Sequence, residues 1–440
     1  MLNVAMTRPV LPTREPAPTE PAPTEPAPTT TGPAFDPFDP AHLADPYPGY
    51  RRLRETDPVH FHRGDGTAAR PDFWALSRYA DVDAAVCDPE AFSSASGLTF
   101  YRDEIEKLGL APTIVMMDPP EHTGKRRLLA KAFSPKRVAE TEPQIRDFVR
   151  GRLAEMAERD DDDEVVDLHR DFSSQIPTFV LAQLFDLPAA DRPRFGPWVS
   201  ALTTLQEEGF RPAGLEGGAA AAVAEMFAYF GELIAERRTS PGEDLVSALT
   251  QAEIDGERLD DWDILGFCFV IVAGGNDTTG NLISHTVALL DEHPPQRELL
   301  VADPGLIPGA LSECLRFESS VQALARTTIR EVTVGGVTIP AGEKVMMLYG
   351  SANRDEREFG PTAEELDITR EITGHLGFAR GPHFCIGSHF ARLQARIALE
   401  ELYAAHPAIG VDRGAAVRAL SPFTRGFHSL PATGFSAPRP

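Results

Sequence analysis

Apolar residues recur at the spacing of an α-helix through much of the chain. The segment 141–158 begins with Thr141, a common N-cap residue, and continues with apolar positions three or four residues apart. These positions are Ile145, Val149, Leu153 and Met156. The alanine-rich segment 218–238 and the segment 388–405 are two further predicted helices.

The longest predicted helix covers residues 261–292 and loses its apolar pattern at the centre. There the sequence reads Ala273-Gly-Gly-Asn-Asp-Thr-Thr-Gly280. Each glycine inside a helix costs roughly 1 kcal/mol relative to alanine, and the polar residues interrupt a run that is otherwise typical of a core. A helix that departs from the helix rules at its middle is a candidate functional site.

Strand patterns appear later in the chain. Residues 331–340 read as two short strands around a Gly-Gly turn, and residues 344–349 read as a third strand. Irregular chain is predicted for 353–376, and short strands with turns for 406–440. We therefore predict a mainly α fold with small β-sheets.

The N-terminal segment differs from everything that follows it. Residues 15–29 repeat Glu-Pro-Ala-Pro-Thr, and alternating prolines prevent both helices and sheet ladders. We predict that residues 1–34 form a disordered or polyproline II tail and that residues 35–440 form a single domain.

Composition narrows the possible cellular setting and partners. Four cysteines, at positions 87, 268, 314 and 385, are too few and too scattered for a disulfide framework, which favours a reducing compartment. The sequence shows no apolar run of about 18 residues and no signal peptide, so we expect a soluble cytoplasmic protein without a membrane partner. A net charge of −24 makes nucleic acid an improbable partner.

Against this acidic background, one basic cluster stands out between residues 125 and 137. It contains Lys125, Arg126, Arg127, Lys131, Lys136 and Arg137. The cluster predicts a docking face for an anionic group or an acidic partner. The alternative is an ordinary solvated helix face.

Cys385 is the most informative single residue. It lies in a glycine-flanked loop directly before the predicted helix 388–405, where backbone N–H groups and the helix dipole favour a thiolate. A hydrolytic nucleophile would need a base, but the surroundings of His383 match no familiar cysteine hydrolase. A zinc site would need more Cys or His nearby, and a buried structural cysteine would not need the glycines. The axial ligand of a haem iron fits the loop best.

Two residue pairs elsewhere support this interpretation. Glu313 and Arg316 are three residues apart in a predicted helix, so they can form an ion pair on one face. His122 and Arg126 are four residues apart, so both can donate to one anion. An exposed salt bridge and a solvated basic surface are the plain alternatives.

Asp277 and Thr278, at the centre of the longest predicted helix, form an acid–alcohol pair. If a haem face lies beneath this helix, the pair can supply protons to bound dioxygen, which a purely apolar helix cannot do. The alternative is a core helix that glycine and threonine make less stable and whose hydroxyl groups all have hydrogen-bond partners.

Taken together, these motifs resemble those of the soluble bacterial cytochrome P450 family over about residues 35–435. The haem-loop pattern Phe-x-x-Gly-x-x-x-Cys-x-Gly is met by Phe378, Gly381, Cys385 and Gly387. The family's Glu-x-x-Arg is met by Glu313 and Arg316, its His-x-x-x-Arg by His122 and Arg126, and its oxygen-activating motif by Gly274, Gly275, Asp277 and Thr278.

The resemblance implies the cytochrome P450 fold, with haem b between the long central helix and the helix that follows Cys385. Cys385 would bind the iron, while Asp277 and Thr278 would act in catalysis. The cofactor contacts implied are His122, Arg126, Arg326, His383, Phe378 and Gly387, with Arg326 and His383 at the haem propionates.

The implied activity is a monooxygenase reaction that inserts one oxygen atom from O2 into a hydrophobic small molecule of terpenoid, steroid or polyketide type. Electrons would come from NAD(P)H through ferredoxin reductase and ferredoxin, which would dock on the basic cluster. A peroxide-using relative, a non-catalytic haem-binding protein and, more distantly, a cysteine hydrolase are the alternatives.

The substrate is expected to contact apolar residues in segments 92–115 and 198–215, the central helix, residues 321–324 and a turn near Phe423. The residues singled out are Phe100, Leu110, Ile114, Val115, Leu202, Leu205, Phe210 and Leu324. Two positions depart from the family pattern. Ala379 replaces the usual glycine and is expected to be tolerated, and Glu365 replaces a common arginine, which leaves the third partner of the Glu313–Arg316 pair unidentified.

Overall fold

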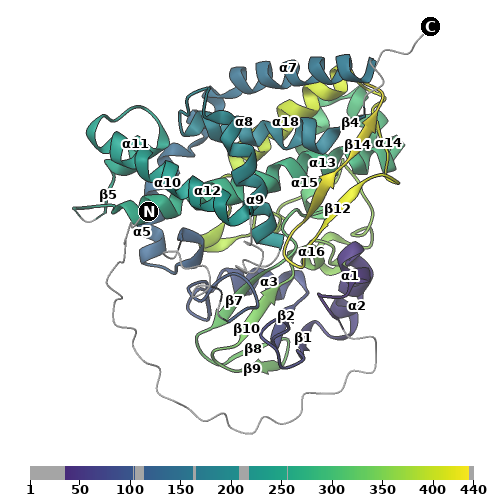
Figure 1. Cartoon of the computed structure of the whole chain (residues 1–440). Helices are drawn as coiled ribbons and strands as arrows, with labels where there is room; N and C mark the ends of the chain where they lie inside the picture. Colours follow the sequence, from purple (N-terminus) through teal and green to yellow (C-terminus); the bar gives the residue numbers. More distant parts are fainter. Residues whose placement is uncertain are drawn as a thin grey trace. The chain divides into compact units, whose positions relative to one another are not determined.

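The computed structural model describes residues 35–102, 104, 113–161, 165–207, 218–254 and 256–435 (Figure 1). The predicted Pro-rich tail of residues 1–34 lies outside the described residues. The division of the chain into a tail and one domain therefore stays a prediction.

Helices dominate the described residues, as the sequence predicts. They are α1 (Pro40–Ala44), α2 (Tyr47–Thr56), α3 (Tyr79–Val86), η1 (Ile114–Met116), α5 (Glu121–Ala132), α6 (Pro135–Glu140), α7 (Glu142–Asp161), η2 (Leu168–Ser173), α8 (Gln175–Leu184), η3 (Arg192–Arg194), α9 (Phe195–Glu207), α10 (Gly218–Thr239), α11 (Leu245–Thr250), α12 (Asp261–Gly275), α13 (Asp277–Glu292), α14 (Pro294–Ala302), η5 (Pro304–Leu306), α15 (Ile307–Phe317), α16 (Tyr349–Ala352), α17 (Glu356–Phe359), η6 (Gly381–His383) and α18 (Ser388–Ala405). The predicted helices at 141–158, 218–238 and 388–405 correspond to α7, α10 and α18. The predicted apolar face of α7 is buried.

The predicted continuous helix 261–292 is instead two helices, α12 and α13, which meet at Asn276. The Asn276 side chain accepts a hydrogen bond from Thr178 Oγ1 of α8 at 2.7 Å. One turn later, Gly280 lies so close to the backbone of Ser174 that an added Cβ would approach its Cα to 3.2 Å. The polar and glycine-rich centre therefore allows α13 to pack closely against η2 and the start of α8.

The largest sheet has five short strands in the order β1-β2-β10-β7-β3. These strands are β1 (Val59–His62), β2 (Phe73–Leu76), β10 (Lys344–Met347), β7 (Leu324–Thr328) and β3 (Phe92–Ser93). Strand β10 is antiparallel to β7 and parallel to β2, so it joins the N-terminal strands to the middle of the chain. In Figure 1 this sheet lies with α1, α2 and α3 on one side of the helical part.

The predicted hairpin at 331–340 is confirmed. Strands β8 (Val332–Val334) and β9 (Val337–Ile339) pair around Gly335 and Gly336, whose φ angles of +56° and +82° suit a tight hairpin turn. The C-terminal strands are β11 (Gly410–Val411), β12 (Val417–Leu420), β13 (Arg425–Ser429) and β14 (Pro431–Thr433). The remaining short strands are β4 (Val166–Asp167), β5 (Glu253–Ile254) and β6 (Glu257–Arg258).

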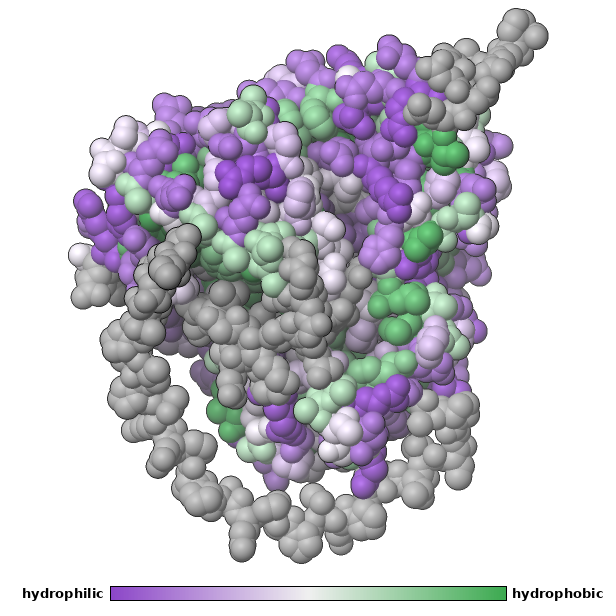
Figure 2. Space-filling view, in the orientation of Figure 1, coloured by the Kyte–Doolittle hydropathy of each residue, from purple (hydrophilic) through white to green (hydrophobic). Residues whose placement is uncertain are grey.

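The main hydrophobic core lies among the helices. Buried residues of α7, α8, α12, α13, α15 and α18 form one continuous cluster. On the face in Figure 2, hydrophilic residues cover much of the described surface over the helices, and hydrophobic residues form separate patches. No helix among the described residues combines the length and hydropathy needed to cross a bilayer.

Glu313 and Arg316 of α15 form a closed ion network with Arg370. The Glu313–Arg316 pair is fully buried and bidentate, with N–O distances of 2.7 and 2.8 Å. Arg370 Nε donates to Glu313 Oε1 at 3.3 Å, and Arg316 also donates to the carbonyls of Asn353 and Ala363. The third partner missing from the sequence pattern is therefore Arg370, five residues after Glu365. We call Glu313, Arg316 and Arg370 the closed network.

Candidate active site

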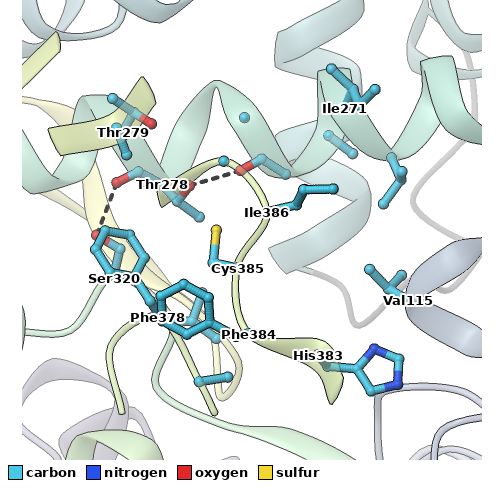
Figure 3. Close-up of a pocket in the computed structure, with 18 of the residues that line it drawn as sticks. Val115, Ile271, Thr278, Thr279, Ser320, Phe378, His383, Phe384, Cys385 and Ile386 are labelled. Carbon is cyan, nitrogen blue, oxygen red and sulfur yellow. Dashed lines mark hydrogen bonds between the residues drawn. The ribbon is translucent and has the colours of Figure 1, made fainter. Parts of the chain in front are cut away.

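A cavity of about 340 Å³ lies between α12, α13, α8, η1 and the loop that carries Cys385. Apolar side chains form most of its wall, among them Leu98, Ile114, Val180, Leu181, Phe269 and Leu282. Figure 3 shows the Cys385 sulfur pointing toward the helix that carries Thr278. Both residues line this cavity, although they are far apart in the sequence.

The loop before α18 holds Cys385 through backbone interactions. The Cys385 N–H donates to the Phe378 carbonyl at 2.9 Å. Gly381 has φ +67°, and a Cβ there would lie 2.8 Å from the Val86 carbonyl oxygen, so this position needs glycine for both conformation and space. Ala379 also has a positive φ, +53°, which strains a residue with a Cβ. The replacement of the family's glycine therefore has an energetic cost at this position.

Burial raises the pKa of the Cys385 thiol above its ordinary value. Hydrogen bonding from the Gly387 and Ser388 N–H groups and the positive charges of Arg126 and Arg392 lower the pKa, as expected at a helix N-terminus, but burial outweighs them. His383 does not serve as a base for the thiol, because its ring packs on His122 with centroids 4.2 Å apart and its Nε2 lies 3.2 Å from Ser94 Oγ. The arrangement suits a metal ligand better than a hydrolytic nucleophile.

His122, Arg126, Arg326 and His383 come together beside the cavity, and we call them the open cluster. Arg326 is 3% exposed, and its Nη1 donates to the Ala325 carbonyl at 2.8 Å. Arg126 donates to the Phe384 carbonyl. In the described part of the chain, no carboxylate forms an ion pair with either arginine.

The electrostatics of the open cluster favour an anion. Burial, followed by the charges of Arg326, His122 and Arg126, lowers the pKa of His383 to about 3. The pKa of His122 is likewise lowered, first by burial and then by Arg126. His122 Nδ1 is buried and has no hydrogen-bond partner within the described residues. Buried cations and donors without a counter-charge are costly, so this cluster is suited to receive the acidic groups of a ligand.

The acid–alcohol pair is divided between two sides of α13. Thr278 lines the cavity, and its Oγ1 donates to the Gly274 carbonyl at 2.8 Å. Asp277 is not among the residues that line the cavity, and its Oδ2 accepts a hydrogen bond from Asn281 at 3.0 Å. Figure 3 also shows the Ser320 hydroxyl donating to the Thr278 carbonyl, which fixes this turn against the cavity wall.

The other predicted cofactor contacts lie at the cavity or beside it. Phe378, Gly387, His122, Arg126 and His383 all line it. Arg326 does not line it, although its charge acts on His122 and His383. An added Cβ at Gly387 would meet only Cys385 Sγ, at 3.9 Å, so the fold itself leaves space beside the sulfur.

Only some of the residues predicted to contact the substrate line the cavity, and contact with a substrate stays a prediction for these. Ile114, Val115, Val321, Leu324 and Phe423 line the cavity. The prediction for Phe100 was wrong, because its ring stacks on Phe73 in the core beside the five-stranded sheet. The predictions for Leu202 and Leu205 of α9 were also wrong, because both pack in the main helical core and not on the cavity. Leu110 and Phe210 lie outside the described residues.

Several lining residues on α8, including Val180 and Leu181, were not predicted from the sequence. The apolar face of α8 could have indicated a buried helix, but not which buried residues face a cavity.

This site fits haem b. A partly buried thiol, an apolar cavity and a cluster of donors without an acidic partner among the described residues match a flat apolar group that carries acidic substituents and a metal. These features define the class as haem-thiolate proteins.

Comparison with known proteins agrees with this class. A family model described as Cytochrome P450 matches residues 306–403. Cytochrome P450 130 of Mycobacterium tuberculosis is 42% identical over 391 residues, which cover 88% of this chain and 94% of that protein. Vitamin D(3) 25-hydroxylase of Pseudonocardia autotrophica is 38% identical over 408 residues, which cover 90% and 96%. A solved structure of a P450 EryK mutant in complex with erythromycin B has a TM-score of 0.78 and 34% identity, and covers 90% of this chain and 99% of that chain.

The chain belongs to the cytochrome P450 family. It is a haem b monooxygenase with the cytochrome P450 fold, and the fold predicted from the motifs is confirmed.

Proposed function

We propose that the protein inserts one oxygen atom from O2 into a hydrophobic natural product, with Cys385 as the ligand of the haem iron. One observation carries the proposal: Cys385 and Thr278 face the same apolar cavity, with the open cluster beside it. Haem, when bound, supplies the oxygen activation. The remaining tasks belong to the side chains of the chain itself.

Thr278 is proposed to hold a proton at Oγ1 inside the cavity. Its hydroxyl donates to the Gly274 carbonyl, within α12, and can turn to donate into the cavity without a change of the helix. Asp277 directly precedes Thr278 and does not line the cavity, and it is proposed to restore that proton from solvent. A hydroxyl in this place supports the use of O2 over the peroxide-using alternative, and a catalytic role over haem storage.

The lining supports an apolar substrate of terpenoid, steroid or polyketide type. Most of the cavity wall consists of aliphatic and aromatic side chains, which offer few partners to a polar molecule. Two relatives have names that cite vitamin D(3) hydroxylation and a complex with erythromycin B. These names support the choice of a large hydrophobic natural product for the first screens.

Electrons are proposed to come from NAD(P)H through ferredoxin reductase and a ferredoxin. The predicted basic cluster is only partly available, because Lys125 pairs with Asp263 and Glu121. Arg127 and Lys136 are exposed and suit an acidic partner. Phe384, next to Cys385, is 39% exposed and offers an apolar contact near the sulfur. The side chain of Lys131 lies outside the described residues.

The test is turnover with a ferredoxin and its reductase, after a screen of hydrophobic natural products for a shift in the haem spin state. We expect Thr278→Ala to keep substrate affinity and to release hydrogen peroxide in place of product. Thr286→Ala is a matched control, because Thr286 is on the same helix and makes the same bond to the carbonyl four residues earlier, at 2.8 Å. Equal product per NAD(P)H in Thr278→Ala and wild type would remove Thr278 from the mechanism.

A further inference from the structure

One turn after Asp277, α13 carries a buried asparagine that bridges two parts of the site. Asn281 is 2% exposed. Its Nδ2 donates to Asp277 Oδ2 at 3.0 Å, and its Oδ1 accepts from the Phe427 N–H of β13 at 3.1 Å. Asn281 therefore joins the acid of the acid–alcohol pair to a strand from the C-terminal end of the chain.

The direction of the Asn281 amide is fixed by its partner on β13. A backbone N–H can only donate, so the amide oxygen must face Phe427 and the NH2 group must face Asp277. The group next to Asp277 is then always a donor. This NH2 group stabilises the carboxylate form of Asp277 and one orientation of the Asp277 side chain.

Gly426 on β13 makes room for this bridge. An added Cβ at residue 426 would lie 2.2 Å from Asn281 Nδ2 and 2.3 Å from its Oδ1. Since the φ angle of Gly426 is not in the left-handed region, the glycine is needed here for space and not for conformation. The sequence of β13 is thus fitted to the Asn281 amide.

The same hairpin reaches the cavity. Phe423 and Thr424, in the turn before β13, line the cavity wall, and Thr424 bridges to Val321. Asn281 therefore connects the wall that faces the substrate with the outer side of the turn that carries Thr278.

We propose that Asn281 is a positioning residue for oxygen activation: it holds the Asp277 carboxylate beside Thr278 and sets its place against β13. This inference rests on the role of Asp277 given under the proposed function. Asn281 itself transfers no proton, because its amide neither gains nor loses one during the reaction.

The test compares Asn281→Ala, Asn281→Asp and Gly426→Ala in the haem-loaded protein. Asn281→Asp keeps the shape and the acceptor for Phe427, but it places a second carboxylate against Asp277. In all three variants we expect product per NAD(P)H to fall about tenfold, while the substrate dissociation constant from the spin-state shift stays within about twofold. A fall in substrate affinity with unchanged coupling would overturn the proposal.

Ser284→Ala is the matched control, because Ser284 is also buried on α13 and bonds to His169 Nδ1 at 3.0 Å away from Asp277. We expect it to leave product per NAD(P)H unchanged. A fall as large as that of the Asn281 variants would show a general effect of weakening α13 and would overturn the proposal.

A double-variant comparison separates this inference from the proposed role of Asp277. If Asn281 acts through Asp277, Asn281→Ala has no added effect in the Asp277→Asn protein. Normal coupling in Asp277→Asn alone would refute the role of Asp277, whereas poor coupling there with normal coupling in Asn281→Ala would refute only the role of Asn281.

A crystal structure of Asn281→Ala gives a readout independent of turnover. We expect the Asp277 carboxylate to have moved in this structure, and an unmoved carboxylate overturns the proposal.

Discussion

The closed network and the open cluster are two groups of polar and charged side chains, each with buried members, and they differ in one respect. In the closed network, Glu313 accepts from both Arg316 and Arg370, so the charges are paired within the protein. In the open cluster, Arg326 is similarly buried, but it donates to a backbone carbonyl and to no carboxylate of the described residues. Burial alone therefore does not distinguish structure from function here, whereas the presence of an internal counter-charge does.

Asp118 does not supply the counter-charge that the open cluster lacks. Asp118 acts on His122 electrostatically, but its oxygens accept from the Ser93 hydroxyl and the Ser94 N–H. The open cluster thus keeps its donors for a ligand, and its stability should depend on that ligand. The closed network should contribute equally with or without haem.

The largest expected effect comes from opening the closed network. Arg316→Leu leaves the buried Glu313 carboxylate with the Asp367 N–H, at 3.0 Å, and the longer contact to Arg370, at 3.3 Å. We expect this change to destabilise the protein by about 3–5 kcal/mol. Thermal unfolding followed by circular dichroism, with and without haem, measures this. If both forms melt like wild type, the closed network does not have the structural role assigned to it.

A substitution in the open cluster should have a smaller effect, and this effect should fall on haem binding and not on the stability of the haem-free protein. Arg326→Leu removes an unpaired buried cation, so the haem-free protein should be no less stable than wild type. Haem binding should weaken by about 1.5–3 kcal/mol, which is about tenfold to a hundredfold, because a charged donor to haem is lost. The rate of haem transfer to a scavenging protein measures this, with Arg330→Leu on the surface as control. Destabilisation of the haem-free protein to the extent of Arg316→Leu would remove the distinction between the two regions.

Low pH should reduce the stability that comes from a second buried cluster, in which Glu318 is paired with arginines of the protein. Glu318 accepts from Arg425 at 2.5 Å and from Arg418 at 3.3 Å, and Arg418 also donates to His285 Nε2 at 3.4 Å. Burial lowers the pKa of His285 to about 3; the Glu318 charge opposes this shift, and the charges of Arg418, Arg425 and His169 add to it.

Between about pH 3 and 6.5 the unfolded chain therefore binds more protons at His285 than the folded protein does. The stability from neutral His285 is complete above pH 6.5 and is lost as the pH falls, by at most about 1.4 kcal/mol per pH unit. His285→Gln should reduce the slope of stability against pH in urea titrations. Identical slopes for the variant and wild type would contradict this assignment.

The smallest expected effect concerns Ala379, in the loop that carries Cys385. Ala379→Gly removes the strain of a positive φ, worth about 1–2 kcal/mol, and adds the entropy cost of glycine, about 0.5–1 kcal/mol. We expect a net gain of about 0.5–1 kcal/mol, seen as a small rise in the melting temperature. A lower melting temperature would show that Ala379 makes favourable contacts that outweigh its strain.

Local motifs explain why so much of the site could be predicted from the sequence. Residues three or four apart on a helix, such as Glu313 and Arg316, are neighbours in any fold that keeps the helix. The loop around Cys385 is similarly local, since its glycines lie within ten residues of the cysteine and the Cys385 N–H donates to the nearby Phe378 carbonyl.

Contacts between distant segments could not be predicted in this way. The pairing of Arg370 with Glu313 depends on the path of an irregular segment, and the fit of Gly426 to Asn281 depends on a strand that arrives from the C-terminal end of the chain. Phe100 was misplaced for a related reason: an apolar pattern predicts burial, but not which of several buried clusters a residue joins.

The central claim is that Cys385 is the iron ligand of a haem held at its edge by the open cluster. The spectrum of the reduced, CO-bound protein tests it most directly, recorded for wild type and Cys385→Ala at equal haem content. We expect wild type to show the Soret band of a thiolate-ligated haem, and Cys385→Ala to lose that band. A fully haem-loaded wild type without the band, or a Cys385→Ala protein that keeps it, would contradict the account.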